Sequence, residues 1–183
     1  MQNNTNKFSE LVKNRKTSYE FTNKKISTAS IKKLITAAMH APSFENYQPW
    51  KFIIIKDKAR ISSIMNFASY GVYHSTPDTV IIAVLDMKHI EDNFESVDSD
   101  GMHIKDGAFS VAIAGNNIAL QAEELGIASC IISFKDKELN DLLKIPKQNS
   151  VIYGIGLGYE KKNAFQKEKE FRKYEDIVSY EHF

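Results

Sequence analysis

The stretch APSFENYQPWKFIIIK, residues 41–56, decides the fold because it joins a polar loop directly to an apolar strand. Two prolines flank the loop, and the hydrogen-bonding side chains of Ser43, Asn46 and Gln48 lie between them. A simple connection would need only a turn. Residues 52–55 then predict a strand that is buried on both faces, because no polar residue interrupts them. The stretch therefore predicts a binding loop at the mouth of a buried strand.

The sequence on either side of this stretch predicts strands that alternate with helices. Such an order is typical of a layered sheet covered by helices, and 183 residues favour one domain spanning 1–183. An acidic, irregular segment at 86–105 is expected to form an exposed excursion. The expected helices span residues 5–14, 28–40, 61–68, 106–125 and 137–143, and the expected strands span residues 52–55, 79–85, 128–132 and 151–157.

The composition excludes several classes of protein. The chain has 24 Lys and Arg against 23 Asp and Glu, so its net charge of +1 gives no indication of a nucleic-acid or membrane partner. A single cysteine, Cys130, excludes an internal disulfide and a Cys-ligated cluster within one chain. The first sixteen residues contain no apolar core of the kind a signal peptide needs, so we expect a cytoplasmic protein.

Two polar segments are candidates for ligand binding. Asn46 and Gln48 each offer a donor and an acceptor, which suits the edge of a neutral heterocycle, or else they brace their own loop. The segment from Arg15 to Ser18 offers two cations and two hydroxyls, which suits a phosphate. Taken alone, that segment is better explained as a solvated basic turn. The glycines of residues 153–158 lie within a strand pattern, so we expect a close approach of another backbone there rather than a dinucleotide site.

No set of side chains has the spacing of a catalytic or metal site. The five histidines show no ligand spacing, and Cys130 lies in an apolar strand where a packing role is favoured. We therefore expect no metal and no catalytic side chain.

Four segments together resemble the FMN-dependent nitroreductase family, and the resemblance covers nearly the whole chain. The loop APSFENYQPW is nearly complete against the family's Ala-Pro-Ser-x-x-Asn-x-Gln-Pro-Trp. The other segments are RKTSYEF at 15–21, NNIALQAEELGIASCIISF at 116–134, and GIGLGY at 154–159 with the later FRKYEDIVSYEHF. The resemblance implies an α+β fold, a three-layer α/β sandwich with a mixed central sheet. It also implies a homodimer that exchanges its termini, including the tail at about 160–183, and binds FMN at the interface.

The resemblance also implies roles for particular residues. Asn46 would bind the pyrimidine side of the flavin, with Ser43 and Gln48 lining the same loop. A backbone N–H at Ile132-Ser133, expected to be that of Ser133, would face flavin N5. The phosphate and ribityl chain would be held by Arg15, Lys16 and Thr17 with the tail cation Arg172, for which Lys173 is the alternative. Lys16, Thr17 and Tyr19 depart from the residues usual in the family.

The function implied by the resemblance is an oxidoreductase. It would pass a hydride from NADH or NADPH through flavin N5 to a nitro compound, a quinone or a similar acceptor, in a ping-pong reaction. The cofactor supplies such chemistry, which agrees with finding no catalytic side chain. The alternatives are an FMN-binding protein with little turnover, or a specialised family reaction such as ene reduction or dehalogenation.

Overall fold

The fold is built on a four-stranded sheet, seen here in a computed structural model that describes residues 7–69, 75–93 and 102–183. The strands are β1 (Trp50–Ile55), β2 (Thr79–Leu85), β3 (Ala128–Ile132) and β4 (Ser150–Gly158), in the order β1-β2-β4-β3. Each neighbouring pair of strands is antiparallel. We predicted a mixed sheet, but the parallel pairing between described residues is a single bridge from Thr17 to Ser129.

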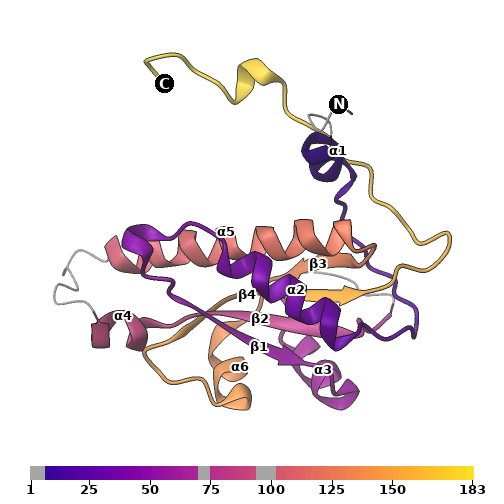
Figure 1. Cartoon of the computed structure of the whole chain (residues 1–183), viewed down its shortest axis with the longest axis horizontal. Helices are drawn as coiled ribbons and strands as arrows, with labels where there is room; N and C mark the ends of the chain where they lie inside the picture. The colour runs from indigo at the N-terminus through magenta and orange to yellow at the C-terminus, as the bar shows by residue number, and fades with distance from the viewer. Residues whose placement is uncertain (1–6, 70–74, 94–101) are drawn as a thin grey trace.

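Helices cover both faces of the sheet, which confirms the α+β, three-layer prediction (Figure 1). One face carries α2 (Thr28–Met39) and α5 (Met102–Glu124), and the other carries α3 (Lys58–Met65) and α6 (Asp136–Leu143). The remaining elements are α1 (Lys7–Asn14), α4 (Met87–Asn93) and the 3-10 turns η1 (Phe44–Asn46) and η2 (Tyr174–Asp176). No described helix is both long and apolar enough to cross a membrane.

Local signals set the ends of the helices. Ser27 caps α2 by accepting a hydrogen bond from the Ser30 N–H at 3.0 Å, and Asp57 caps α3 in the same way. The end of α5 is a glycine turn in which Gly126 has a φ of 65°. There the Ile127 N–H donates to the Ala122 carbonyl at 2.8 Å, a pairing typical of helices that end at glycine.

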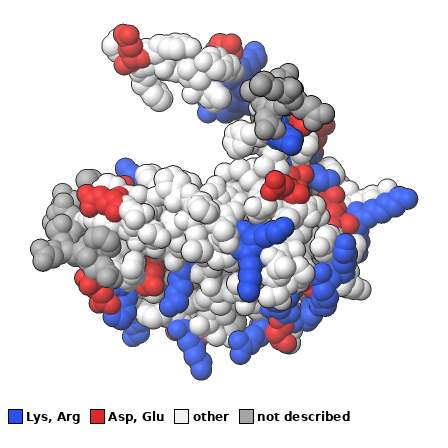
Figure 2. All heavy atoms as spheres, in the orientation of Figure 1, with Lys and Arg blue, Asp and Glu red and all other residues white. Residues whose placement is uncertain are grey.

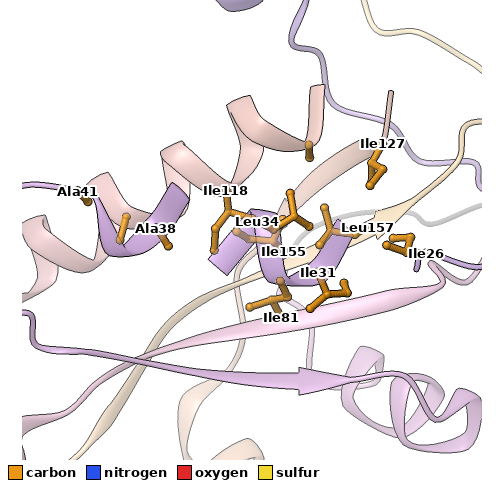
Figure 3. Close-up of a cluster of buried hydrophobic side chains, with 12 residues drawn as sticks. Ile26, Ile31, Leu34, Ala38, Ala41, Ile81, Ile118, Ile127, Ile155 and Leu157 are labelled. Carbon is orange, nitrogen blue, oxygen red and sulfur yellow. The ribbon is translucent and has the colours of Figure 1, made fainter. Parts of the chain in front are cut away.

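The main core lies between the sheet and the α2–α5 layer. Leu34 of α2 and Ile118 of α5 pack over Ile81 and Ile155 of the two central strands (Figure 3). On the opposite face, Ile61 and Ile64 of α3 and Leu139 of α6 pack on Val80, Ile82 and Ile132. Burial on both faces explains why every residue of β2 is buried, as predicted.

Strand β1 differs from its prediction, because it forms an edge of the sheet. Phe52 and Ile53 are only half-buried and Ile54 is 41% exposed, so the strand is not buried on both faces. A run of isoleucines does not show whether a strand has one neighbour or two, and here only β2 pairs with β1 among the described residues.

The segment at 86–105 also differs from its prediction. Residues 87–93 form helix α4, and residues 102–105 form the first turn of α5, so these parts are not irregular. Residues 94–101 lie outside the described part of the chain. Met87 and Ile90 are buried against Leu85 and Val111, which explains why the beginning of this segment is helical despite its acidic character.

The strand glycines do make room for a close neighbour, but the neighbour is a side chain rather than a backbone. A Cβ at Gly154 would lie 2.6 Å from the Phe134 ring, and one at Gly158 would lie 2.7 Å from the Phe21 ring. These glycines therefore admit two aromatic rings onto β4, which is a central strand.

Candidate functional site

The polar loop after α2 holds three non-glycine residues in the left-handed region of backbone space. Glu45, Asn46 and Gln48 have φ values of 42°, 59° and 49°. Such conformations are uncommon for residues other than glycine and persist only where the surroundings enforce them. The loop is therefore held in a specific shape, and strain of this kind is typical of ligand-binding segments.

Hydrogen bonds within the loop and to α5 enforce this shape. Ser43 Oγ accepts a hydrogen bond from the Gln48 N–H at 3.0 Å, and its carbonyl accepts one from the Asn46 N–H at 3.1 Å. The Phe44 N–H donates to Ser110 Oγ of α5 at 3.2 Å. Ser43 thus braces the loop, whereas the exposed amides of Asn46 and Gln48 approach each other only at 3.4 Å. These two amides are therefore available to a ligand.

The buried side chain of Tyr47 anchors the loop from below. Its ring packs edge-on against Phe44, with centroids 5.5 Å apart, and stacks on His103 of α5 at 6.1 Å. The Tyr47 hydroxyl donates to a Glu45 carboxylate oxygen at 2.9 Å, and this hydrogen bond raises the pKa of Tyr47 above its ordinary value. The Tyr47 carbonyl accepts a hydrogen bond from His89 Nε2 of α4 at 3.1 Å. The loop is therefore tied to both α4 and α5.

The basic turn after α1 lies against β3, because the Ser18 N–H donates to the Ser129 carbonyl at 3.0 Å. A cavity of about 400 Å³ lies between this turn, the middle of α5 and β3. The cavity brings together the guanidinium-bearing Arg15 and the hydroxyl of Thr17. Its other lining residues are Tyr19, Asn116, Ala119, Cys130 and Ile131.

The ammonium group of Lys16 is committed to a different partner. It lies 2.7 Å from a Glu160 carboxylate oxygen, and Lys16 does not line the cavity. Burial raises the pKa of Glu160, but hydrogen bonds from Lys16 and Gln166 help to outweigh burial and bring the pKa below its ordinary value. Of the two cations predicted in this turn, the structure brings only Arg15 to the cavity.

The backbone expected to face flavin N5 continues from the cavity wall. Ile131 is 57% exposed at the cavity, Ile132 is buried in the core, and the exposed Ser133 follows the end of β3. The Ser133 carbonyl accepts a hydrogen bond from the Ser69 N–H at 2.8 Å, which fixes the orientation of the strand end.

The tail approaches the basic turn through a residue that the sequence did not single out. Lys169 Nζ donates to the Arg15 carbonyl at 2.6 Å. Arg172 instead donates to the Asp176 carbonyl within the tail, and Lys173 precedes η2. The structure therefore does not bring Arg172 to the cavity. Asn116 was also missed, although two adjacent asparagines in the mostly apolar middle of α5 were a usable signal.

Within one chain, the polar loop and the basic turn belong to different hollows. Ser43 lines an apolar depression of about 270 Å³ with its neighbours Pro42 and Phe44 and four residues of α5, namely Asp106, Phe109, Ser110 and Ile113. Figure 1 shows the loop at one end of α5 and the turn after α1 toward the other. The two hollows share no lining residue within one chain.

Comparisons with known proteins identify the family and the fold. The family model described as "Nitroreductase family" matches residues 12–159. A curated relative from Archaeoglobus fulgidus, which bears the name of an NADH dehydrogenase/NAD(P)H nitroreductase, is 29% identical and covers 85% of this chain and 84% of its own. A nitroreductase family protein from Clostridium difficile is 25% identical, with a TM-score of 0.78 and coverage of 95% of this chain and 98% of its own.

The fold is also that of a larger flavin enzyme. The NADPH:FMN oxidoreductase from Vibrio harveyi, solved in complex with NAD+, has a TM-score of 0.85 at 20% identity, covering 96% of this chain and 77% of its own. The family match spans most of the chain and includes β1 to β4, the polar loop and the basic turn. The chain belongs to the Nitroreductase family.

Proposed function

We propose that the chain is an FMN-dependent oxidoreductase that takes a hydride from NADH or NADPH and passes it to an electron-poor acceptor, such as a nitro compound or a quinone, in a ping-pong reaction. Family membership and the relatives' names support an NAD(P)H-dependent oxidoreductase. The observation that carries the FMN proposal is the cavity that Arg15 and Thr17 line together.

The residues of the Arg15 cavity and of the polar loop fit the two ends of FMN. A guanidinium and a hydroxyl are suitable partners for a phosphate, because they donate several charge-assisted hydrogen bonds to its oxygens. The exposed amides of Asn46 and Gln48 offer both donors and acceptors, which suits the C=O and N–H groups of the flavin pyrimidine edge. The chemistry of the donor sets therefore agrees with the cofactor.

Each group of residues then has a definite task. Arg15 and Thr17 would hold the phosphate, Asn46 and Gln48 would fix the plane of the ring, and the Ser133 N–H would donate to N5. Bound FMN would supply the hydride chemistry itself, which no side chain of the chain is required to perform. The braced, strained loop fixes the backbone that carries the two amides before the cofactor binds, which lowers the entropy cost of ordering the loop on binding.

We further propose that the site is completed in a homodimer. The face of α2, η1 and α5 exposes Met39, Phe44, Ile104, Phe109 and Ile113, more large apolar side chains than a solvated surface needs. Figure 2 shows the C-terminal tail running clear of the body. Exposed tail residues include Phe171, Tyr174, Ile177 and Tyr180. A second copy would cover these surfaces and bring its polar loop to the basic turn of the first.

The deciding experiment is the visible spectrum of the purified protein, followed by anaerobic addition of NADH or NADPH. Protein that binds FMN should be yellow, lose its colour with one or both donors, and regain it with a nitroaromatic or a quinone. Yellow protein that neither donor bleaches would contradict the reductase and leave an FMN-binding protein. Colourless protein that cannot be reconstituted with FMN would contradict the cofactor proposal.

A further inference from the structure

A third cavity, of about 550 Å³, lies between β1, α4 and the connection from α6 to β4. It shares no lining residue with the Arg15 cavity or with the depression beside Ser43. Its volume falls within the range of about 300–1,000 Å³ that is typical of small-molecule sites. No role in the proposed reaction accounts for it.

The floor of this cavity is apolar and its rim is charged. Ile53 of β1 and Val84 of β2 form part of the floor, and Ile145 and Pro146 close one side. The charged lining residues are three lysines and two aspartates, Lys51, Lys88, Lys144, Asp86 and Asp92, so one positive charge is left over. The chemistry suits a ligand with an apolar body and one negative charge.

Two of the lysines are available to such a ligand. Lys88 is committed to Asp92, with 2.6 Å between the ammonium and the carboxylate. Neither Lys51 nor Lys144 forms an ion pair among the residues that the structure describes. Lys144 also ends α6 with a φ of 55°, a position where glycine is usual. The chain therefore keeps a cationic side chain at this rim in a backbone conformation that disfavours it.

The rim beside α4 is held by a buried asparagine. Asn149 is 4% exposed, and its Nδ2 donates to Asp86 Oδ1 at 3.0 Å. Its Oδ1 accepts a hydrogen bond from the Lys88 N–H at 3.2 Å. Both ends of the amide are thus satisfied, and the start of α4 is fixed against β4.

The same rim is bonded directly to the polar loop. The Asp86 N–H donates to the Pro49 carbonyl at 2.8 Å, and His89 Nε2 lies 3.1 Å from the Tyr47 carbonyl. Asp86 and His89 both line the third cavity. A ligand that moves either residue therefore acts on the backbone that carries Asn46 and Gln48.

We propose that this cavity binds a small amphiphilic monoanion, an apolar body bearing one carboxylate that Lys51 and Lys144 recognise, and that its occupancy changes the affinity of the polar loop for FMN. The anion site does not depend on the proposed function, whereas its coupling to FMN binding rests on the proposed function. Coupling of this kind is reciprocal, so FMN must change the affinity for the anion by the same factor.

The test uses the full-length protein saturated with FMN and two probes, 2-naphthoate and its neutral counterpart 2-naphthylmethanol, in ligand-observed NMR titrations. Replacing two exposed cations should weaken naphthoate binding about threefold or more in the Lys51→Gln/Lys144→Gln variant. Binding of the neutral probe should not change. The matched control is Lys32→Gln/Lys33→Gln, which removes two exposed lysines from α2 and should leave both probes unaffected.

Naphthoate binding that is equal in all three proteins, or that weakens equally with both lysine pairs, would overturn the site. The coupling is tested by measuring FMN affinity with and without saturating naphthoate in the wild type and in His89→Ala. A shift in the wild type that shrinks in the variant supports the coupling, and no shift in the wild type overturns it. If the protein binds no FMN, the naphthoate titrations still decide the site, so failure of the proposed function is recognised separately.

Discussion

The ammonium of Lys16 lies 2.7 Å from the Glu160 carboxylate, while its neighbour Arg15 lines the cavity. Adjacent cations in one basic turn therefore have different tasks. The Lys16 ion pair joins the turn to Glu160, two residues beyond the end of β4. Phe21 forms a β-bridge with the same residue. Arg15 is left to meet an anion, with its own carbonyl held by Lys169.

Arg15→Met and Lys16→Met should thus affect FMN binding unequally. Charge-assisted hydrogen bonds contribute roughly 1.5–3 kcal/mol each, so Arg15→Met should weaken FMN binding by about tenfold or more at low salt. Lys16→Met should weaken it by no more than about threefold, because that charge is already paired. Fluorescence titrations with FMN at low and high salt measure both, and screening should shrink the Arg15 effect at high salt.

Equal losses in the two variants would contradict this division of tasks. A loss in Arg15→Met that does not depend on salt would indicate a folding defect instead of a lost phosphate contact. Urea unfolding of both variants distinguishes that case.

Asn46→Gly should separate binding from stability. Asn46 has a φ of 59°, and glycine adopts that conformation without the cost an ordinary residue bears. The free energy of unfolding should therefore be unchanged or higher by up to about 1 kcal/mol. Loss of the amide should still cost about 1 kcal/mol of FMN binding, or roughly fivefold in affinity.

The measurements are urea denaturation of the FMN-free protein and titration with FMN. Wild-type FMN affinity in Asn46→Gly would remove Asn46 from the ring contact. Ser63→Ala is a suitable control that should leave both stability and FMN affinity nearly unchanged. The Ser63 hydroxyl donates to the Ala59 carbonyl on the exposed side of α3.

The sequence predicted the elements well wherever local signals determine them. Ser27 and Gly126 mark helix ends by their own side-chain or backbone chemistry, and the ends of β3 were predicted to the residue. Helix α3 was predicted three residues too late, at 61–68, because the cap at Asp57 was not recognised. The position of β1 at the sheet edge depends on pairing with distant strands, so its isoleucines could not show it. The helix at residues 87–93 forms because Met87 and Ile90 find a buried surface that the local sequence does not contain.

The sequence predicted which types of residue form the candidate site, but not how those residues are arranged in space. The polar loop was marked by its side chains, whereas its three left-handed residues carry no glycine signal. The pairing of Lys16 with Glu160 joins residues 144 positions apart, so no local pattern announces it. The approach of Lys169 to Arg15 is likewise a contact across nearly the whole chain.

Gly154→Ala should destabilise the protein, whereas Gly156→Ala should be close to neutral. A Cβ at Gly154 would lie 2.6 Å from Phe134 Cε2, while a Cβ at Gly156 would find its nearest atoms at 3.4 Å. Overpacking of the kind expected in Gly154→Ala costs about 1–3 kcal/mol of stability. In Gly156→Ala the added methyl group makes only ordinary contacts, and alanine also lowers the conformational entropy of the unfolded chain, so the free energy of unfolding should stay the same or rise slightly. Urea denaturation of both variants measures the difference.

A second substitution tests the cause. Phe134→Leu removes the ring. The loss of stability caused by Phe134→Leu should therefore be smaller in the Gly154→Ala variant than in the wild type. Additive losses in this double-mutant cycle would show that the ring is not what the glycine accommodates.

Asp78→Asn should lower stability at neutral pH and reduce its decline in acid. The Asp78 side chain is 1% exposed, and its Oδ2 accepts a hydrogen bond from the Ile26 N–H at 2.9 Å, just before α2. Burial raises the pKa of Asp78, but the Ile26 hydrogen bond and the Lys25 ammonium at 3.1 Å outweigh it, so the pKa lies below its ordinary value. The carboxylate therefore contributes stability above its unfolded pKa of about 3.9, and loses it as the pH falls through the lower folded value.

The variant keeps the shape of the side chain and removes its charge. A lost charged hydrogen-bond acceptor at a buried position should cost about 1–3 kcal/mol at pH 7. The cost should shrink as the pH falls below about 4, because the wild type loses the same contribution there. Urea denaturation at pH 7, 5 and 3.5 measures this, with Asp141→Asn on the exposed side of α6 as the control. A cost that stays constant over this range would show that Asp78 acts through packing and not through its charge.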